Sequence, residues 1–303
     1  MRALVIGYGS IGQRHTRLLR GLCCDVAVLS RRELDFPSCY TDLLRALAEH
    51  RPEYVVVANP TSLHHETIEA LAAAGFAGKV LVEKPLFDHS RALIDAPFSH
   101  LAVAYNLRFH PVIQRLRGLV LGETVISVQA YMGQYLPDWR PASDYRQSYS
   151  ASAAQGGGAL RDLSHELDYL AWIFGDWQSV TALGGHLSAL EIDSDDLFVL
   201  LMQMSRCPVV SVQVSYLDRT ARRCIVVNTE RLTIEADLIA GTISCGNELE
   251  TLLVGRDFTY EAMHRAMLGD ENATLCSLDE GLATLQLIDA AEQANRNREW
   301  VIR

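Results

Sequence analysis

A glycine pattern directly after a short apolar run constrains the fold of this chain more than any other feature. Residues 3–6 form a β-type run, and Gly7, Gly9 and Gly12 follow it in the spacing G-x-G-x-x-G. Between a strand and a helix, the first glycine permits a tight turn and the second lets the backbone approach a pyrophosphate. The third lets the helix pack closely on the strand. The pattern predicts dinucleotide binding; the alternative is a glycine-rich turn that binds nothing.

The residues after the glycines predict an amphipathic helix over 10–22, with Ile11, His15 and Leu18 on one side. The unpaired N–H groups and the positive dipole end of such a helix attract phosphate. We therefore expect Ser10 and Ile11 to contact the cofactor together with the glycines, and His15 to help with phosphate.

Composition and charge exclude several classes of protein. The 303 residues suggest two domains, and the apolar runs are too short for a membrane span or a signal peptide. The net charge of −10 repels nucleic acid and anionic membranes, so we expect neither as a partner. The seven cysteines lack C-x-x-C spacing, which argues against disulfides and zinc; we expect no metal and a cytoplasmic location.

Residues 1 to about 105 alternate strand-like and helix-like segments, which predicts an α/β unit with a doubly wound parallel (Rossmann) sheet. We expect strands at 3–6, 26–29, 54–58, 80–82 and 101–105, and helices at 10–22, 40–49 and 62–74.

Beyond residue 120, strand candidates follow one another with short turns, which predicts an α+β domain with an open, mostly antiparallel sheet. We expect strands at 124–131, 179–183, 197–204, 209–216, 223–228, 231–235, 242–245 and 250–254, and helices at 159–174, 260–268 and 278–295. The predicted domains are a dinucleotide-binding Rossmann domain, 1–120, and a substrate-binding and oligomerisation domain, 121–303.

The end of the second strand predicts which dinucleotide binds. NAD-binding versions of this fold place an acidic residue there, whereas this chain has Ser30, Arg31 and Arg32. A hydroxyl followed by two guanidinium groups suits a 2′-phosphate, so we favour NADP over NAD. The alternative is that the arginines are solvated and Glu33 takes the acidic role.

Lys84 follows the strand at 80–82, within Glu83-Lys84-Pro85. Ligands of open α/β sheets bind outside the carboxyl ends of the strands, so Lys84 should project toward the cofactor. A lysine there can bond a substrate oxygen and transfer a proton. Without this placement, a surface lysine would be the better interpretation.

A glycine run at 156–158 leads into a predicted helix with a second chemical group. Asp162 and His165 are three residues apart, so they share a face of a continuous helix, and Tyr169 lies one turn beyond. A histidine beside a carboxylate is a plausible general acid or base, because the carboxylate sets its tautomer. The alternative is a structural Asp–His hydrogen bond.

We expect His264, on a later helix, at the surface.

The segment 137–150 precedes this helix and has no periodicity, and a connection of this length usually serves a ligand. Its aromatic side chains offer faces for sugar rings, and its arginines suit a carboxylate or phosphate. These expected substrate-binding residues are Trp139, Arg140, Tyr145, Arg146 and Tyr149. The alternative is an interface loop packed against a neighbouring subunit.

Taken in order, these motifs resemble one family. They are Gly7-x-Gly9-x-x-Gly12, Asn59-Pro60-Thr61-x-x-His64, Glu83-Lys84-Pro85, Tyr105-Asn106-x-Arg108-Phe109-x-Pro111 and the glycine-led helix with Asp162, His165 and Asp168. Over essentially its whole length the chain resembles the glucose-fructose oxidoreductase / inositol dehydrogenase (Gfo/Idh/MocA) family. The resemblance implies an NAD(P)-dependent oxidoreductase acting on a sugar, polyol or sugar derivative.

The resemblance also implies roles for individual residues. Lys84 and His165 become catalytic with Asp162 as their partner, and Arg108 borders the substrate. The residues implied near the cofactor are Asn59, Pro60, Thr61, His64, Glu83, Lys84 and Asn106. It further implies a cis Lys84–Pro85 bond and a homodimer or homotetramer formed through the C-terminal sheet.

The resemblance leaves two points open. Many family members space the helix Asp and His four apart, whereas here the spacing is three and Arg161 takes the four-back position; either Asp162 fills the role or the acid is supplied differently. The 137–150 segment resembles relatives from acidic-sugar or nucleotide-sugar pathways, which points to an anionic sugar. The alternative functions are a non-catalytic dinucleotide-binding sensor and a redox-assisted glycoside hydrolase with tightly bound NAD.

Overall fold

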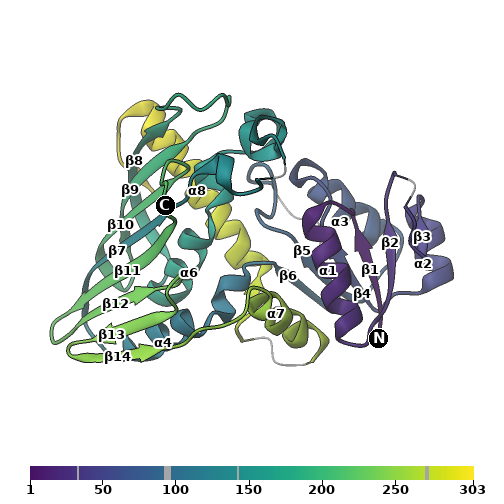
Figure 1. Cartoon of the computed structure of the whole chain (residues 1–303), viewed down its shortest axis with the longest axis horizontal. Coiled ribbons are helices and arrows are strands. Elements are labelled where there is room, and N and C mark those ends of the chain that lie inside the picture. The colour runs from purple at the N-terminus through teal and green to yellow at the C-terminus, as the bar shows by residue number, and fades with distance from the viewer. Residues whose placement is uncertain (33, 92–96, 142, 270–272) are drawn as a thin grey trace. The chain divides into compact units, whose positions relative to one another are not determined.

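Two β-sheets organise the chain, one in each of two units (Figure 1). The structure is a computed structural model that describes residues 1–32, 34–91, 97–141, 143–269 and 273–303. The first unit contains Met1–Phe109 and Arg256–Leu282, and the second contains His110–Gly255 and Ala283–Arg303. Both sheets are of the predicted kind.

The first unit has a seven-stranded sheet in the order β15-β6-β5-β4-β1-β2-β3, in which only β15 runs antiparallel to its neighbour. Its strands are β1 (Arg2–Ile6), β2 (Asp25–Leu29), β3 (Cys39–Tyr40), β4 (Tyr54–Val57), β5 (Lys79–Val82), β6 (His100–Val103) and β15 (Cys276–Ser277). Its helices are α1 (Ser10–Gly21), α2 (Leu43–His50), α3 (His64–Ala73) and α7 (Phe258–Leu268), with short 3-10 turns η1 (Thr61–Leu63) and η2 (Asn106–Phe109). The central strands are buried apolar runs, as a sheet covered on both faces requires.

Helix α7 belongs to the first unit, although it follows the strands of the second sheet in sequence. Met263 and Met267 of α7 pack into the core formed by β1 and its neighbours. Asp257, just before α7, accepts hydrogen bonds from Arg14 at 2.8 Å and Arg17 at 2.6 Å, both on α1. The observed units therefore differ from a division at residue 120: the boundary lies at 109–110, and Arg256–Leu282 joins the first unit.

The second unit has a nine-stranded sheet in the order β14-β13-β12-β11-β7-β10-β9-β8-β16, antiparallel except for the β7–β10 pair. Its strands are β7 (Val125–Gly133), β8 (Trp177–Gly185), β9 (Leu197–Met204), β10 (Cys207–Ser215), β11 (Arg222–Thr229), β12 (Thr233–Asp237), β13 (Thr242–Cys245), β14 (Glu248–Thr251) and β16 (Val301–Ile302). Its helices are α4 (Pro111–Leu119), α5 (Ala159–Asp162) and α6 (His165–Phe174). The 3-10 turns η3 (Leu136–Asp138), η4 (Tyr145–Gln147), η5 (Tyr149–Ala151) and η6 (Ala153–Gln155) lie between β7 and α5. Helix α8 (Leu278–Asn297) begins in the first unit and continues into the second.

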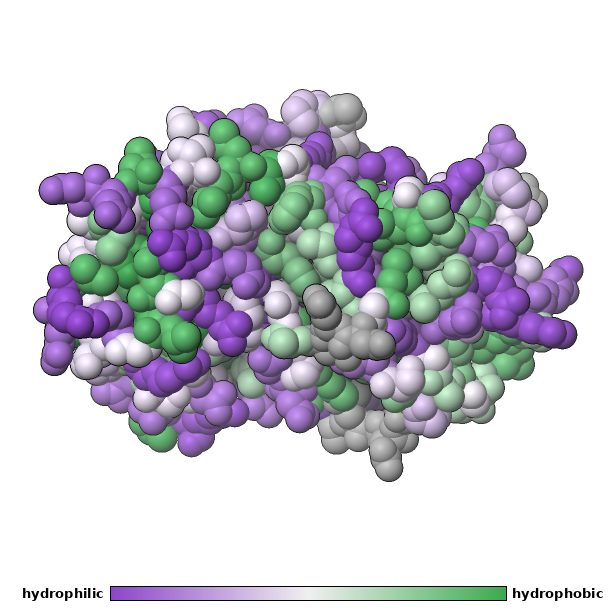
Figure 2. Space-filling view, turned by 90° about the horizontal axis from the view of Figure 1, so that it is seen from below, coloured by the Kyte–Doolittle hydropathy of each residue, from purple (hydrophilic) through white to green (hydrophobic). Residues whose placement is uncertain are grey.

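Strand β9 shows why one face of this sheet is covered and the other open. Phe198, Leu200 and Met202 are buried, whereas the alternate residues Val199 and Leu201 are exposed. Because successive side chains of a strand point to opposite faces, the exposed set lies on one surface of the sheet. Figure 2, a view from below, shows small groups of hydrophobic side chains among hydrophilic ones.

Within the part of the chain that the structure describes, no helix is both long and apolar enough to cross a membrane.

Candidate active site

The three glycines of the first turn each meet a different steric demand. Gly7 has φ of +96°, and a Cβ there would lie 2.6 Å from the carbonyl oxygen of Ala58. A Cβ on Gly12 would lie 2.1 Å from the carbonyl oxygen of Gly7. A Cβ on Gly9, by contrast, would meet nothing within 4 Å. The first and third glycines therefore allow close packing, and the second borders open space.

The start of α1 beside that space suits an anion. Gly9 is the N-cap residue, no side chain caps the helix, and its first turn contains no acidic residue. The N–H groups of the first turn have no partner within the helix, and the helix dipole adds partial positive charge. Ser10 and Ile11 begin this helix, so the residues predicted to hold a diphosphate fit one.

The turn after β4 lies next to the same loop, since Asn59 N also approaches Gly7. The Asn59 amide donates to Thr67 Oγ1 at 2.8 Å, while Asn59 Oδ1 is buried and has no hydrogen-bond partner among the described residues. A buried acceptor of this kind fits a ligand that donates a hydrogen bond. Pro60 and Thr61 continue the turn into η1.

His64 is buried between two backbone segments. Its Nε2 lies 3.0 Å from Asn59 O and its Nδ1 lies 3.1 Å from Leu86 O. Burial lowers the pKa of His64, and the bonds to carbonyl oxygens oppose that shift. His64 therefore braces the turn after β4 against the segment that follows Lys84.

The end of β2 supplies the predicted hydroxyl and guanidinium groups. Ser30 Oγ accepts the backbone N–H of Arg32 at 3.1 Å, and the Arg32 guanidinium donates to Tyr8 O in the glycine turn at 3.1 Å. Arg31 and Arg32 are both exposed. Glu33, the alternative acidic residue, lies outside the described residues.

Lys84 is half-buried and lies two residues beyond the end of β5. Its backbone N–H donates to Oε2 of the buried Glu83 at 3.2 Å, and the Lys84–Pro85 bond is cis, as expected. Asn106, also buried, donates to Thr259 Oγ1 at 2.6 Å.

Arg108, which the resemblance places beside the substrate, is buried in the first unit. Its side chain is 1% exposed, and Nη1 lies 2.9 Å from Glu280 Oε2 and 3.4 Å from Leu275 O. Both partners lie in Arg256–Leu282 of the first unit, a segment that the sequence analysis assigned to the substrate-binding domain. Arg108 therefore anchors that segment.

The predicted helix over 159–174 is two helices, α5 and α6, separated by Leu163 and Ser164. Leu163 leaves the helical region, with φ of −97° and ψ of 26°. The expectation that Asp162 and His165 share one face through helical spacing is therefore wrong. His165 is buried and is the first residue of α6.

Asp162 has tyrosine partners that the sequence did not reveal. Tyr149 OH donates to its Oδ1, and Tyr216 OH, at the end of β10, donates to its Oδ2 at 2.6 Å. Trp139 packs edge-on against Tyr216 with ring centroids 5.2 Å apart. Burial raises the pKa of Tyr216 well above its usual value, so its hydroxyl stays a donor. Arg161, four residues before His165, pairs with carboxylates of α8.

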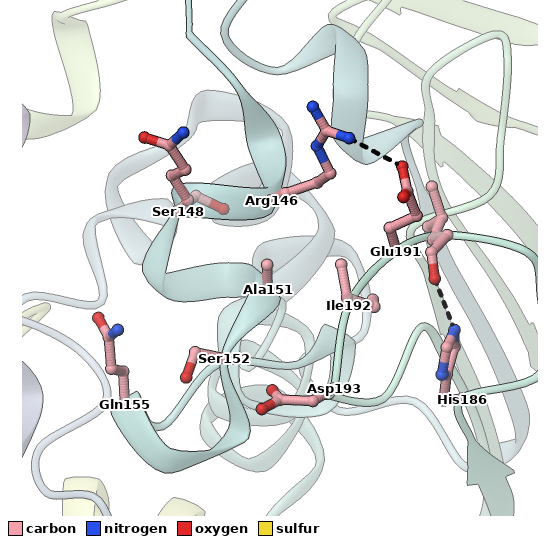
Figure 3. A pocket seen from close by; sticks show the side chains of 11 residues that line it. Arg146, Ser148, Ala151, Ser152, Gln155, His186, Glu191, Ile192 and Asp193 are labelled. Carbon is pink, nitrogen blue, oxygen red and sulfur yellow. Dashed lines mark hydrogen bonds and ion pairs between the residues drawn. The ribbon is translucent and has the colours of Figure 1, made fainter.

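Arg146, Gln147 and Ser148 of the expected substrate loop line a cavity of about 530 Å³ within the second unit (Figure 3). Arg146 pairs there with Asp144 at 2.9 Å and with Glu191 at 3.1 Å, and these carboxylates raise its pKa. Asp144 and Glu191 offset the positive charge of Arg146, which was expected to bind an anion. Arg146 therefore orders this loop. Tyr145 OH accepts the Glu191 N–H, and Arg140 is exposed.

The glycine run before α5 permits another close approach. A Cβ on Gly158 would lie 2.1 Å from Asp195 Oδ1, and Asp195 Oδ2 accepts the Leu160 N–H at 2.9 Å. Burial raises the pKa of Asp195 to about 7. The sequence analysis missed this carboxyl group, which adjoins the helix of Asp162. In the described parts of the chain, no group of three or more His, Cys, Asp or Glu side chains is arranged to hold a metal ion.

Comparison with known proteins agrees with this architecture. Residues 1–96 match the oxidoreductase family with an NAD-binding Rossmann fold, and residues 113–235 match the GFO/IDH/MocA C-terminal domain. The chain belongs to the Gfo/Idh/MocA family of oxidoreductases. An uncharacterized oxidoreductase from Synechocystis sp. is 31% identical over 158 residues, which are 49% of this chain and 41% of that protein.

Solved structures share the fold over the length of this chain. GenD2 from gentamicin A biosynthesis, in complex with NAD, is 24% identical, with a TM-score of 0.82 over 100% of this chain and 96% of that one. The WlbA dehydrogenase from Bordetella pertussis, in complex with NADH and UDP-GlcNAcA, is 19% identical, with a TM-score of 0.82 over 100% and 97% of the two chains. These likenesses show the fold, and the family models place this chain in an oxidoreductase family with an NAD-binding Rossmann domain.

The raised pKa of Asp195 predicts how stability changes with pH. The folded protein holds the Asp195 proton more tightly than the unfolded chain, so the free energy of unfolding falls as pH rises between about 4 and 7. The group contributes up to about 4 kcal/mol to this fall, at 1.36 kcal/mol per pKa unit. Asp195→Asn should flatten the dependence measured by urea unfolding at pH 5 and 8, while the exposed Asp193→Asn should not. Equal slopes for Asp195→Asn and the wild type would contradict this assignment.

Proposed function

We propose that the protein is an NAD(P)-dependent dehydrogenase or reductase that moves a hydride to or from a hydroxyl or ketone carbon of a sugar, sugar acid or nucleotide sugar. One observation carries this proposal. The open space at Gly9, the uncapped start of α1 and Lys84, two residues beyond the end of β5, belong to the same unit. A lysine at a strand end near a dinucleotide site is placed for chemistry on the bound substrate.

The residues proposed to hold the cofactor divide by the part they would contact. Gly9 to Gly12 and the first turn of α1 would hold the diphosphate, and Asn59 Oδ1 would accept a hydrogen bond from the ligand. When bound, the nicotinamide supplies the hydride acceptor or donor. Pro60, Thr61 and Asn106 would line the same end of the sheet, with His64 and Glu83 supporting them from within.

The chain's own contribution is proton handling. A secondary alcohol that loses a hydride must also lose its hydroxyl proton, and a lysine amine or an imidazole at hydrogen-bond distance can take it. We assign this role to Lys84 with His165. Asp162, whose oxygens accept from Tyr149 and Tyr216, would act as a fixed negative charge near the start of α6.

The substrate class is proposed from the second unit. Trp139 and Tyr149 are half-buried aromatics close to Asp162, a setting that suits a sugar ring. Because Asp144 and Glu191 balance the charge of Arg146, the exposed Arg140 is the better residue to bind an anionic group. The likeness to a dehydrogenase crystallised with UDP-GlcNAcA supports an anionic sugar or nucleotide sugar.

We propose NADP as the preferred coenzyme, because Ser30, Arg31 and Arg32 follow β2 without an intervening carboxylate. We also propose a cytoplasmic location, since all seven cysteines are free thiols, the state that a reducing compartment maintains. The net charge of −10 supports a small-molecule substrate over nucleic acid or a membrane surface.

Lys84→Ala should reduce kcat by about 100-fold or more, because general acid–base groups contribute 10²–10⁴-fold. Cofactor affinity should stay within about twofold, measured by nicotinamide fluorescence. The matched control is Lys79→Ala, since Lys79 donates to Gly269 O in the same unit and should leave kcat unchanged. Full activity of Lys84→Ala would contradict the assignment of Lys84 as a catalytic residue. A wild-type protein that binds cofactor but turns over no sugar would favour the non-catalytic dinucleotide-binding sensor. NAD that co-purifies with the protein and shows no net turnover would favour the redox-assisted glycoside hydrolase.

Replacing Arg31 and Arg32 together with serine should weaken NADPH binding by about 10-fold or more. A hydrogen bond to a charged group is worth about 1.5–3 kcal/mol, and 1.4 kcal/mol is a factor of ten. NADH binding should change little, since it has no 2′-phosphate. Calorimetric titration of both coenzymes checks this, and an equal loss for both would show that the arginines do not select the phosphate.

We propose that the open face of the nine-stranded sheet pairs with a second copy of the chain to form a homodimer or homotetramer. Leu183 and Val199 face each other on neighbouring strands and are 61% and 39% exposed, and Leu201 is exposed beside them. Val199→Lys with Leu201→Lys should give monomers in sedimentation velocity. Leu44→Lys, at an exposed leucine of α2, should not. A monomeric wild type would rule out the pairing.

A further inference from the structure

Four buried polar side chains form a continuous hydrogen-bonded chain in the first unit. Tyr54 OH lies 3.0 Å from His264 Nδ1, His264 Nε2 lies 2.8 Å from His15 Nδ1, and His15 Nε2 lies 2.7 Å from Glu83 Oε1. Tyr54, His15 and His264 are 0% exposed and Glu83 is 7% exposed. The expectations of His15 beside the phosphate and His264 at the surface are therefore replaced by a buried chain that joins β4, α7 and α1 to the end of β5.

The protonation states along this chain follow from burial. Burial, together with the neighbouring His15, lowers the pKa of His264 well below its usual value, so His264 is neutral. Burial raises the pKa of Tyr54 well above its usual value, so it keeps its hydroxyl proton. In this state the Tyr54 hydroxyl can donate to His264 Nδ1, and the proton of His264 then lies on Nε2.

The remaining bonds follow from that tautomer. His264 Nε2–H donates to His15 Nδ1, so His15 carries its proton on Nε2 and donates it to Glu83 Oε1. In this arrangement every donor points the same way, and both imidazole acceptor nitrogens and Glu83 Oε1 have a donor, which favours a stable buried polar network. Its acceptor end is a carboxylate.

The acceptor end of the chain adjoins Lys84. Glu83 Oε2 accepts the backbone N–H of Lys84 at 3.2 Å, so each oxygen of Glu83 has a fixed donor. Lys84 and the cis Lys84–Pro85 bond follow immediately, and Leu86 O is held by His64. Two histidines therefore hold the backbone around Lys84. His15 acts through Glu83 before Lys84, and His64 contacts Leu86 O after it.

We propose that Tyr54, His264 and His15 are positioning residues that, through Glu83, fix the direction of the Lys84 side chain for proton transfer. The inference rests on the proposed function only in taking Lys84 as the proton-transferring group. A purely structural brace between α1 and α7 is the competing explanation, because Arg14, Arg17 and Asp257 already join these elements. The two explanations differ in what happens at Lys84.

His264→Leu removes the N–H that His15 accepts, whereas His264→Gln places an amide N–H near the Nε2 position and keeps that bond. We expect His264→Leu to lower kcat by about 10-fold with the KM for coenzyme within about twofold, and His264→Gln to recover most of the loss. Tyr54→Phe keeps the shape of the core and should cost about threefold or less. Met267→Ala, a buried change on the same helix, should lower the melting temperature without changing kcat.

A second measurement does not depend on turnover. Reductive ¹³C-methylation labels Lys84, and its NMR signal is identified by its absence in Lys84→Arg. The signal should move in His264→Leu and coincide with wild type in His264→Gln and Met267→Ala. If it moves as expected but no sugar is turned over, the positioning stands and the proposed function fails.

An unmoved Lys84 signal in His264→Leu would overturn the proposal whether or not the enzyme is active. Should His264→Leu not fold, His15→Leu and His15→Gln test the same chain at its next member. His15→Leu removes the donor to Glu83 and should move the Lys84 signal, whereas Gln places an amide N–H near Nε2 of His15 and should keep the wild-type signal. An unmoved signal in His15→Leu would contradict the proposal.

Discussion

The contact between the Gly7 carbonyl and the bare α-carbon of Gly12 sets much of the geometry of the first unit. Since a Cβ on Gly12 would lie 2.1 Å from that oxygen, α1 can approach β1 only with glycine at this position. The approach fixes where the helix begins and thus where its N–H groups point. It also fixes His15, one turn further along, at hydrogen-bond distance from Glu83. One steric constraint thus connects the proposed diphosphate site to the backbone of Lys84.

Most of the fold could be predicted from the sequence, because its strands and helices have clear periodicity. Each expected strand of the second sheet is present, with small shifts at the ends. The assignment of α7 to the first unit could not be predicted, since the helix follows β14 in the chain and its methionines would suit any apolar core. The break at Leu163 was hidden for a similar reason, since residues 159–174 read as one apolar-faced helix.

The site was predictable where a local motif carries it, as in the glycine turn and Glu83-Lys84-Pro85. It was not predictable where the partner is distant in sequence. Asp162 is held by Tyr216, Arg108 by Glu280, and Arg146 in part by Glu191. In each case a charged or polar group that seemed available for a ligand has a protein partner. For Asp162 and Arg108 the reason is burial, which makes an unpaired charge costly. A tyrosine after a strand or a carboxylate on a helix is too common in sequences to identify these partners.

The most direct test of this account is a crystal structure of the protein grown with NADPH. We predict diphosphate oxygens within hydrogen-bond distance of the backbone N–H groups of residues 9–12, against the open side of Gly9. Coenzyme bound elsewhere, or no binding of NADPH or NADH in crystals or by calorimetry at millimolar concentration, would contradict it. The roles assigned to Lys84, to the residues at the end of β2 and to the chain from Tyr54 to Glu83 would then have no basis.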